Sequence, residues 1–397
     1  MPLLLYTYIA TEILAPFFAS FLIINAILFL GRLVPILNVI FDLGVSPGDF
    51  FRLCAYMLPN LMIFSIPMAS MTAVIVAVSR MVNDNEIMAL KATGIGLVRL
   101  LPPVIVIALS TSLLAYFSAV TLIPQGTLAT KTLFLQMAEE KIDKGVQPGQ
   151  FSEGLKNVVL YIDAVDQQTR QWQGVYVSDM RHGDTPFTIV AKTGSLDAQP
   201  ENMLITLTLS NGTLHRAEKN ITQTIRFDRY QINLPITPPT EIAGTSVSEV
   251  GKNGLSQSQL LEQVQKHGPK SAIGISLLIE YYTRMALPVG GFILTILGLP
   301  LAMLARPGRR PLGVPLGLLL FVIYYVLFTA GRANSENGHL PVVVGIWLSD
   351  ILIAVFTVIL TRQVAKETTP LFLTRLNGSL QTLLAGLPGI KLGEKQR

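Results

Sequence analysis

The chain has 397 residues, of which 50% are hydrophobic and only 14% are charged, and its net charge is +5. Ordinary soluble domains carry about 25% charged residues, so a purely soluble enzyme, a disordered chain and a nucleic-acid-coating protein are all poor fits. The single cysteine, Cys54, excludes an internal disulfide and any cysteine-based zinc or iron–sulfur site.

Six apolar windows are long enough to cross a bilayer, which requires about 20 mostly apolar residues. In chain order they are residues 13–31, 53–79, 100–123, 285–305, 311–331 and 340–361, and the only charged residue in them is Asp350. No Lys or Arg precedes the first window, so we expect a span there rather than a cleavable secretory signal. The sequence therefore predicts a membrane protein with six transmembrane helices.

Basic residues are distributed unevenly between the two ends of these spans. Twelve Lys or Arg lie after spans two, four and six, whereas only Arg32, Arg52 and Arg332 lie at the opposite ends. Short loops rich in Lys and Arg stay in the cytoplasm, so both termini are expected there. The polar insert between spans three and four, residues 124–280, then lies outside. It carries 14 Lys or Arg against 16 Asp or Glu, and no nucleic-acid partner is expected.

The loop between spans two and three predicts a short cytoplasmic helix over residues 84–93. Asn83 is the expected N-cap with Glu86 at the third position, and Gly94 is the expected positive-φ stop. Such a helix is either a connector or a docking element for a cytoplasmic partner. The residues that would serve docking are Asp84, Glu86, Ile87, Leu90 and Lys91.

The insert contains short runs rich in β-branched and aromatic residues, which predict an antiparallel β sandwich or barrel. The runs are residues 151–165, 174–181, 186–192, 202–210 and 221–234. Asn211-Gly212 predicts a hairpin turn, and residues 256–267 predict a linker helix. The expected domains are spans one to three (1–123), an extracytoplasmic β domain (124–255), a linker (256–280), spans four to six (281–366) and a cytoplasmic tail (367–397).

Enzyme motifs are weak in this chain. Gly251-Lys252 lacks the glycine and the Ser or Thr of a phosphate-binding loop, because Ser246 and Asn253 occupy those positions. Gly44–Gly48 matches G-x-S-x-G around Ser46, but a Ser-Pro turn that starts span two is the better interpretation. The four scattered histidines predict no zinc site, and we expect no catalytic residue, metal or cofactor.

Polar and small residues of the spans leave alternatives open. Asp350 is either functional or hydrogen-bonded to a neighbouring helix. Arg32 and Arg332 either attract an anionic lipid headgroup or extend to the membrane surface as helix-end arginines commonly do. Gly313 and Gly317 form a G-x-x-x-G that predicts close helix packing, possible also in a gate helix that later separates.

Three stretches resemble the LptF/LptG (YjgP/YjgQ) permease family of the lipopolysaccharide exporter. Residues 85–96, NEIMALKATGIG, are similar to the family pattern S-E-x-x-x-[ML]-x-A-x-G-x-S, with Asn85 and Gly96 replacing its two serines. The others are GQFSEGLKNVVLYIDAVD, which enters the insert, and ARPGRRPLGVPLGLLLFVIYYVLF, which runs through span five. The likeness covers roughly residues 1–366, and the GQF segment is more similar to the LptF branch.

The resemblance implies a transport subunit in the inner membrane of a Gram-negative cell. Such a permease pairs with a sister LptF/LptG permease, and each contacts one copy of an LptB-like ATPase, which uses the ATP. Glu86 matches the acidic residue of the family's coupling helix, and Arg32 would attract lipopolysaccharide phosphates. The external domain is expected to be a β-jelly roll that passes acyl chains to LptC/LptA-like periplasmic bridge proteins.

Two other functions remain open on the sequence. One is a permease of another motor-driven system such as lipoprotein release, although that class usually has four spans with the external domain after the first. The other is a membrane enzyme, which would require Ser46 or Asp350 for turnover.

Overall fold

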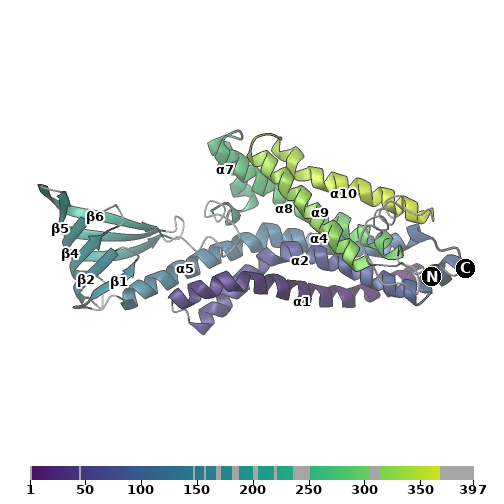
Figure 1. Cartoon of the computed structure of the whole chain (residues 1–397), viewed down its shortest axis with the longest axis horizontal. Helices are drawn as coiled ribbons and strands as arrows, with labels where there is room; N and C mark the ends of the chain where they lie inside the picture. The colour runs from purple at the N-terminus through teal and green to yellow at the C-terminus, as the bar shows by residue number, and fades with distance from the viewer. Residues whose placement is uncertain are drawn as a thin grey trace, which may run out of the picture. The chain divides into compact units, whose positions relative to one another are not determined.

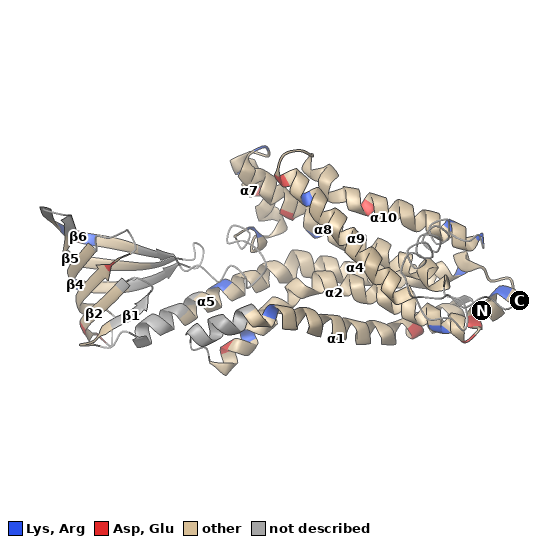
Figure 2. Ribbon diagram, in the orientation of Figure 1, with Lys and Arg blue, Asp and Glu red and all other residues tan. Residues whose placement is uncertain are grey.

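A computed structural model of the chain describes residues 2–43, 46–145, 148–155, 158–166, 171–180, 187–199, 204–218, 221–235, 251–304 and 313–366 (Figure 1). Within these residues, six helical segments have the length and composition to cross a membrane, as predicted. Figure 2 shows that charged residues are sparse along them. The predictions for the arginines between spans four and five and for the tail 367–397 lie outside the described residues.

The helices extend beyond the predicted windows because helical backbone continues into the flanking polar residues. They are α1 (Pro2–Leu43), α2 (Pro47–Asn83), α3 (Glu86–Ala92), η1 (Leu97–Leu100), α4 (Leu101–Phe117), η2 (Ser118–Leu122), α5 (Ile123–Gly145), α7 (Gln257–His267), α8 (Ala272–Met303), α9 (Gly313–Glu336) and α10 (Val342–Ala365). The third span joins α4 to α5 through the π-helical turn η2. The polar insert therefore begins with a helix, and its first strand starts only at Phe151.

The chain divides into two compact units. The first contains Met1–Leu28, Asn60–Leu122 and Leu255–Arg397, and the second contains Phe29–Pro59 and Ile123–Gly254. In the first unit, α8, α9 and α10 pack against one another, and α4 and α7 pack against α8. In the second unit, α2 and α5 share a small core of Leu53, Met57, Leu133, Phe134 and Met137.

Glycines allow close approach of the membrane helices of the first unit. A Cβ atom on Gly313 would lie 2.8 Å from the Ile75 side chain of α2, and one on Gly317 would lie 2.5 Å from it. The predicted G-x-x-x-G therefore packs against a helix of the same chain. At Gly331 an added Cβ would overlap the backbone carbonyl of Gly345, so α9 and α10 touch main chain to main chain.

The insert forms one six-stranded antiparallel sheet in which strands follow chain order, β1 to β6. The strands are β1 (Phe151–Leu155), β2 (Val158–Val165), β3 (Trp172–Asp179), β4 (Phe187–Gln199), β5 (Leu204–Glu218) and β6 (Ile221–Pro235). The inserted β domain is thus confirmed. Each described strand pairs with the next one along the chain, so the strands form a meander. The expected jelly roll would have Greek-key crossings instead.

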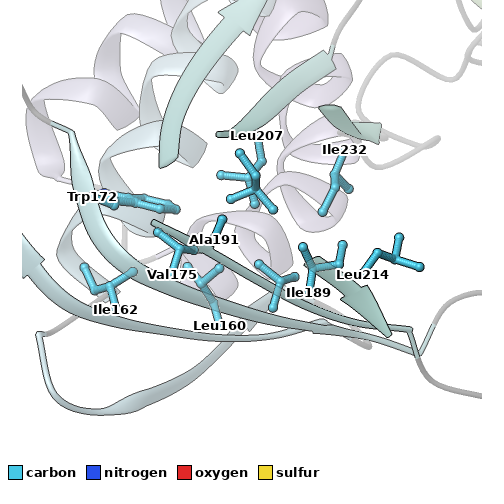
Figure 3. Close-up of a cluster of buried hydrophobic side chains, with 11 residues drawn as sticks. Leu160, Ile162, Trp172, Val175, Ile189, Ala191, Leu207, Leu214 and Ile232 are labelled. Carbon is cyan, nitrogen blue, oxygen red and sulfur yellow. The ribbon is translucent and has the colours of Figure 1, made fainter. Parts of the chain in front are cut away.

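One face of this sheet carries an apolar cluster drawn from β2 to β6 (Figure 3). Ile162, Val175, Val177 and Leu209 have no exposed surface. A flat single sheet would leave one layer of side chains open to solvent on each face, so the sheet must curve over its own inner face to bury them. The interior of the β domain is therefore filled by its own side chains.

A transverse crease interrupts the alternation of side chains along the strands. Trp172 and Val175 of β3 are three residues apart and both buried, although a regular strand turns every second residue to the same face. Left-handed backbone at Gly174 (φ 62°) lies between them. A second left-handed residue, Asn211 of β5 (φ 55°), lies level with Gly174 across the sheet. The strand registers place Lys192 of β4 between them, opposite Gly174 on one side and Asn211 on the other. The crease reorients the inner face and helps the sheet to curve.

The predicted hairpin at Asn211-Gly212 is wrong. β5 passes through both residues and pairs on both sides, with β4 and with β6. The positive φ that favours an Asn-Gly turn is present at Asn211, but these long-range pairings keep the strand running. Gly212 serves close packing instead, because a Cβ there would overlap the Val190 carbonyl and the Phe227 ring.

Candidate functional site

The short helix α3 follows α2 after a two-residue turn. Asn83 is the last residue of α2, so its predicted role as N-cap is wrong. The reversal depends on Asn85, whose left-handed backbone (φ 58°) is one that asparagine tolerates better than most residues. The predicted stop at Gly94 is confirmed: φ is 80°, its N–H binds the Lys91 carbonyl, and the Ile95 N–H binds the Leu90 carbonyl.

The two apolar faces of α3 differ in exposure. Ile87 is buried against its own chain and Leu90 is half-buried, so Ile87 anchors the helix. Met88 is 62% exposed and is the large apolar side chain that α3 presents at its surface. Lys91 is exposed on the last turn of the helix.

Acidic side chains gather where α3 meets the ends of α1 and α2. The Tyr8 hydroxyl lies 3.0 Å from each carboxylate oxygen of Glu86. Arg80 lies 2.7 Å from the Glu12 carboxylate and 3.6 Å from that of Asp84. The group therefore holds three carboxylates against one guanidinium. Tyr8 and Glu12 did not stand out in the sequence; their only signal is a polar pair four residues apart on one helix face.

Arg32 and Arg332, the arginines predicted at span ends, belong to different units. Arg332 lies near the end of α9, where its Nε donates to the Glu336 carboxylate at 3.2 Å. Arg32 is half-buried and lies in the part of α1 that belongs to the second unit.

Asp350 is a buried residue at a three-helix contact. It is 2% exposed, and its Oδ1 accepts a hydrogen bond of 2.9 Å from the Tyr324 hydroxyl of α9. Gly290 of α8 makes room for the pair, because a Cβ there would overlap the Tyr324 hydroxyl. The Oδ2 atom of Asp350 has no hydrogen-bond partner among the described residues. The structure thus shows the hydrogen bond to a neighbouring helix that the sequence left as one alternative.

Asp350→Asn should keep the fold, because the amide oxygen still accepts from Tyr324, with a loss of stability below about 1 kcal/mol. Asp350→Leu should cost about 1–3 kcal/mol, since the buried Tyr324 hydroxyl loses the carboxylate to which it donates. Denaturant titration in detergent micelles measures both. Equal losses in the two variants would mean that the hydrogen bond is not what Asp350 provides.

Arg284 is a further buried polar residue, which the sequence placed just outside span four. It is 2% exposed, donates through Nε to Glu280 at 2.8 Å and through Nη1 to the Leu255 carbonyl at 2.7 Å. It thereby fastens the segment before α7 to α8. The signal for it was the Glu280–Arg284 spacing of four residues, which places both on one helix face.

Ser46 caps the start of α2. Its hydroxyl lies 2.7 Å from the Asp49 carboxylate and accepts the Asp49 N–H at 3.3 Å. The interpretation of this segment as a turn that begins span two is therefore confirmed, and accepting the Asp49 N–H is the function of an N-cap. A nucleophilic role for Ser46 has no support in these contacts.

Comparison with known proteins extends the likeness across the chain. The family described as Lipopolysaccharide export system permease LptF/LptG matches residues 7–363. Lipopolysaccharide export system permease protein LptF of Escherichia coli (strain K12) is 21% identical over 368 residues, which cover 90% of this chain and 94% of that protein. The uncharacterized protein RP871 of Rickettsia prowazekii (strain Madrid E) is 24% identical over 305 residues, or 77% of this chain and 82% of the relative. Because the family match runs from the first membrane helix through the last, the chain belongs to the LptF/LptG family of lipopolysaccharide export permeases.

Proposed function

We propose that this permease is the LptF-type member of a pair with a sister LptG permease, and that an LptB-like ATPase dimer drives it. The pair extracts lipopolysaccharide from the inner membrane. The β domain then passes the lipid to LptC/LptA-like bridge proteins in the periplasm.

The observation that carries the coupling part of this proposal is the acidic group around α3. Glu12, Asp84 and Glu86 outnumber Arg80, which leaves an excess of negative charge beside the exposed Met88. A cationic groove with an apolar floor on the ATPase would complement this surface. Asp84 and Glu86 lie in the loop that the distribution of Lys and Arg assigns to the cytoplasm, where ATP is available.

The energetics of extraction require such a motor. Each CH₂ group taken from the bilayer costs about 0.8 kcal/mol, so a lipid with several acyl chains does not leave unaided. The sequence has no phosphate-binding loop of its own. ATP-driven closure of the cavity between the two permeases would supply the energy, as a shift between two conformational states.

The β domain offers an apolar face that fits acyl chains. Its inner face is already filled in this structure, with several side chains fully buried, so acyl chains can enter only when the curved sheet opens. The edge strand β6 is the part of that face that solvent and ligands can reach. Ile225 of β6 pairs with the inward-facing Leu214 and is 56% exposed.

A photo-crosslinking side chain at Ile225, in the assembled complex in lipopolysaccharide-containing membranes, should capture the lipid only when ATP is supplied. Val190 is the matched control, because it is 45% exposed but lies between the inward-facing Ile189 and Ala191 and so points to the outer face. We expect no ATP-dependent capture at Val190. Equal capture at Ile225 with and without ATP would contradict driven transport through this face.

A further inference from the structure

Helix α1 is attached to the rest of its unit along a narrow line. Only 11% of its apolar window is buried, and the buried apolar side chains are Ile9, Ile13 and Phe17, which form one stripe at four-residue spacing. Most of its other large apolar side chains are exposed, including Leu14, Phe18, Leu22, Ile23, Ile27 and Leu30. Small forces at one end can therefore shift this helix more easily than α2 or α8, of whose apolar windows 72% is buried.

Polar contacts hold the cytoplasmic end of α1 to the coupling elements. Tyr8 donates its hydroxyl to both oxygens of Glu86, the first residue of α3. One turn further along α1, Glu12 accepts from Arg80 near the end of α2. The two contacts lie on one face of α1, since Tyr8 and Glu12 are four residues apart.

Glu86 can hold Tyr8 and a partner's cation together. Each carboxylate oxygen has two lone-pair sites, and the shared hydroxyl proton of Tyr8 uses only part of this capacity. A hydrogen bond to a carboxylate is also among the stronger ones available to a tyrosine. The same side chain that would face the ATPase is thus bonded to α1.

We infer that Tyr8, with Glu12, is a positioning residue that makes α1 follow the movements of α3. This inference rests on the proposed function, in which α3 receives the force of the ATPase. When α3 moves, either the hydrogen bond to Tyr8 breaks or α1 moves with it. Beyond the contacts of Tyr8 and Glu12, α1 is held by its narrow apolar stripe and by the hydrogen bond of Asn25 to Ser65 of α2, which lies several turns further along the helix. Movement of the N-terminal end of α1 with α3 is therefore the easier response.

Tyr8→Phe tests the inference, with Tyr6→Phe as the matched control. Tyr6 lies on the same helix, and its hydroxyl makes no hydrogen bond with the residues that the structure describes. In the assembled complex, Tyr8→Phe should leave recovery of the ATPase unchanged but lower the lipopolysaccharide released per ATP hydrolysed roughly fivefold, the size expected of one exposed hydrogen bond to a charged group. Tyr6→Phe should keep the wild-type ratio.

A second measurement reports the movement itself. Spin labels at the exposed positions Leu4 of α1 and Ala92, the last residue of α3, give the distance between the two helices with and without nucleotide. The wild type should keep one narrow distance in both states, whereas Tyr8→Phe should broaden or lengthen it when ATP binds. An unchanged distance distribution together with a wild-type release ratio in Tyr8→Phe would overturn the inference. Failure of the proposed function is distinguishable, because the wild-type complex would then show no ATP-dependent lipid release at all.

Discussion

Glu86→Arg should abolish recovery of the ATPase with the membrane complex. The substitution reverses the charge at the centre of the acidic group and places a second guanidinium near Arg80. Like charges facing a cationic groove cost about 2 kcal/mol or more, which weakens binding by about 30-fold. Affinity purification of the complex, with the amount of ATPase retained per permease, measures the effect.

Glu86→Gln separates the charge from the contact with α1, because the amide oxygen still accepts from Tyr8. We expect this variant to weaken ATPase recovery less than Glu86→Arg does, while α1 stays attached. Arg99→Glu, in the exposed part of η1 beyond α3, is a control for charge reversal elsewhere in the same loop and should leave ATPase recovery unchanged. Full recovery of the ATPase with Glu86→Arg would exclude α3 as the docking element.

Arg284→Met should destabilise the protein by about 3–5 kcal/mol, the range found when one partner of a buried ion pair is removed. The variant leaves the half-buried Glu280 carboxylate and the Leu255 carbonyl without the guanidinium that now binds them. Denaturant titration in detergent micelles gives the free energy of unfolding. We also expect the segment before α7 to become more accessible to protease.

Arg332→Met is the matched control for this loss. Arg332 also pairs with a glutamate four residues away, but its side chain is 27% exposed and that of Glu336 is 42% exposed. Exposed ion pairs contribute about 0–1 kcal/mol, so the control should lose far less stability. Equal losses in the two variants would mean that burial of the Arg284 pair is not what makes it important.

Local patterns predicted much of the fold correctly. The six spans came from apolar runs. The predicted linker helix is present as α7, and it starts at a capping box in which Ser256 and Gln259 bond to each other's backbone N–H. The stop of α3 at Gly94 depends on the backbone freedom of one residue. In each case the responsible interactions lie within a few residues of the chain.

Predictions failed where the local pattern does not by itself decide the structure. Asn211-Gly212 favours a turn, but hydrogen bonds to β4 and β6 on both sides hold it in a strand. Asn83 fits an N-cap, but α2 continues through it and the reversal falls on Asn85. Ile87 reads as a docking residue, but its own chain buries it.

The sequence by itself determined the class of the protein, the number of spans, the inserted β domain and the family, because hydropathy, charge distribution and motif spacing are properties of contiguous residues. Only the tertiary structure decided which polar side chains act together. Tyr8 and Glu86 are 78 residues apart, and Tyr324 and Asp350 are 26 apart. Such pairs depend on how the helices pack, and small residues such as Gly290 and Gly331 determine how closely neighbouring helices approach. No local pattern specifies which helix faces meet.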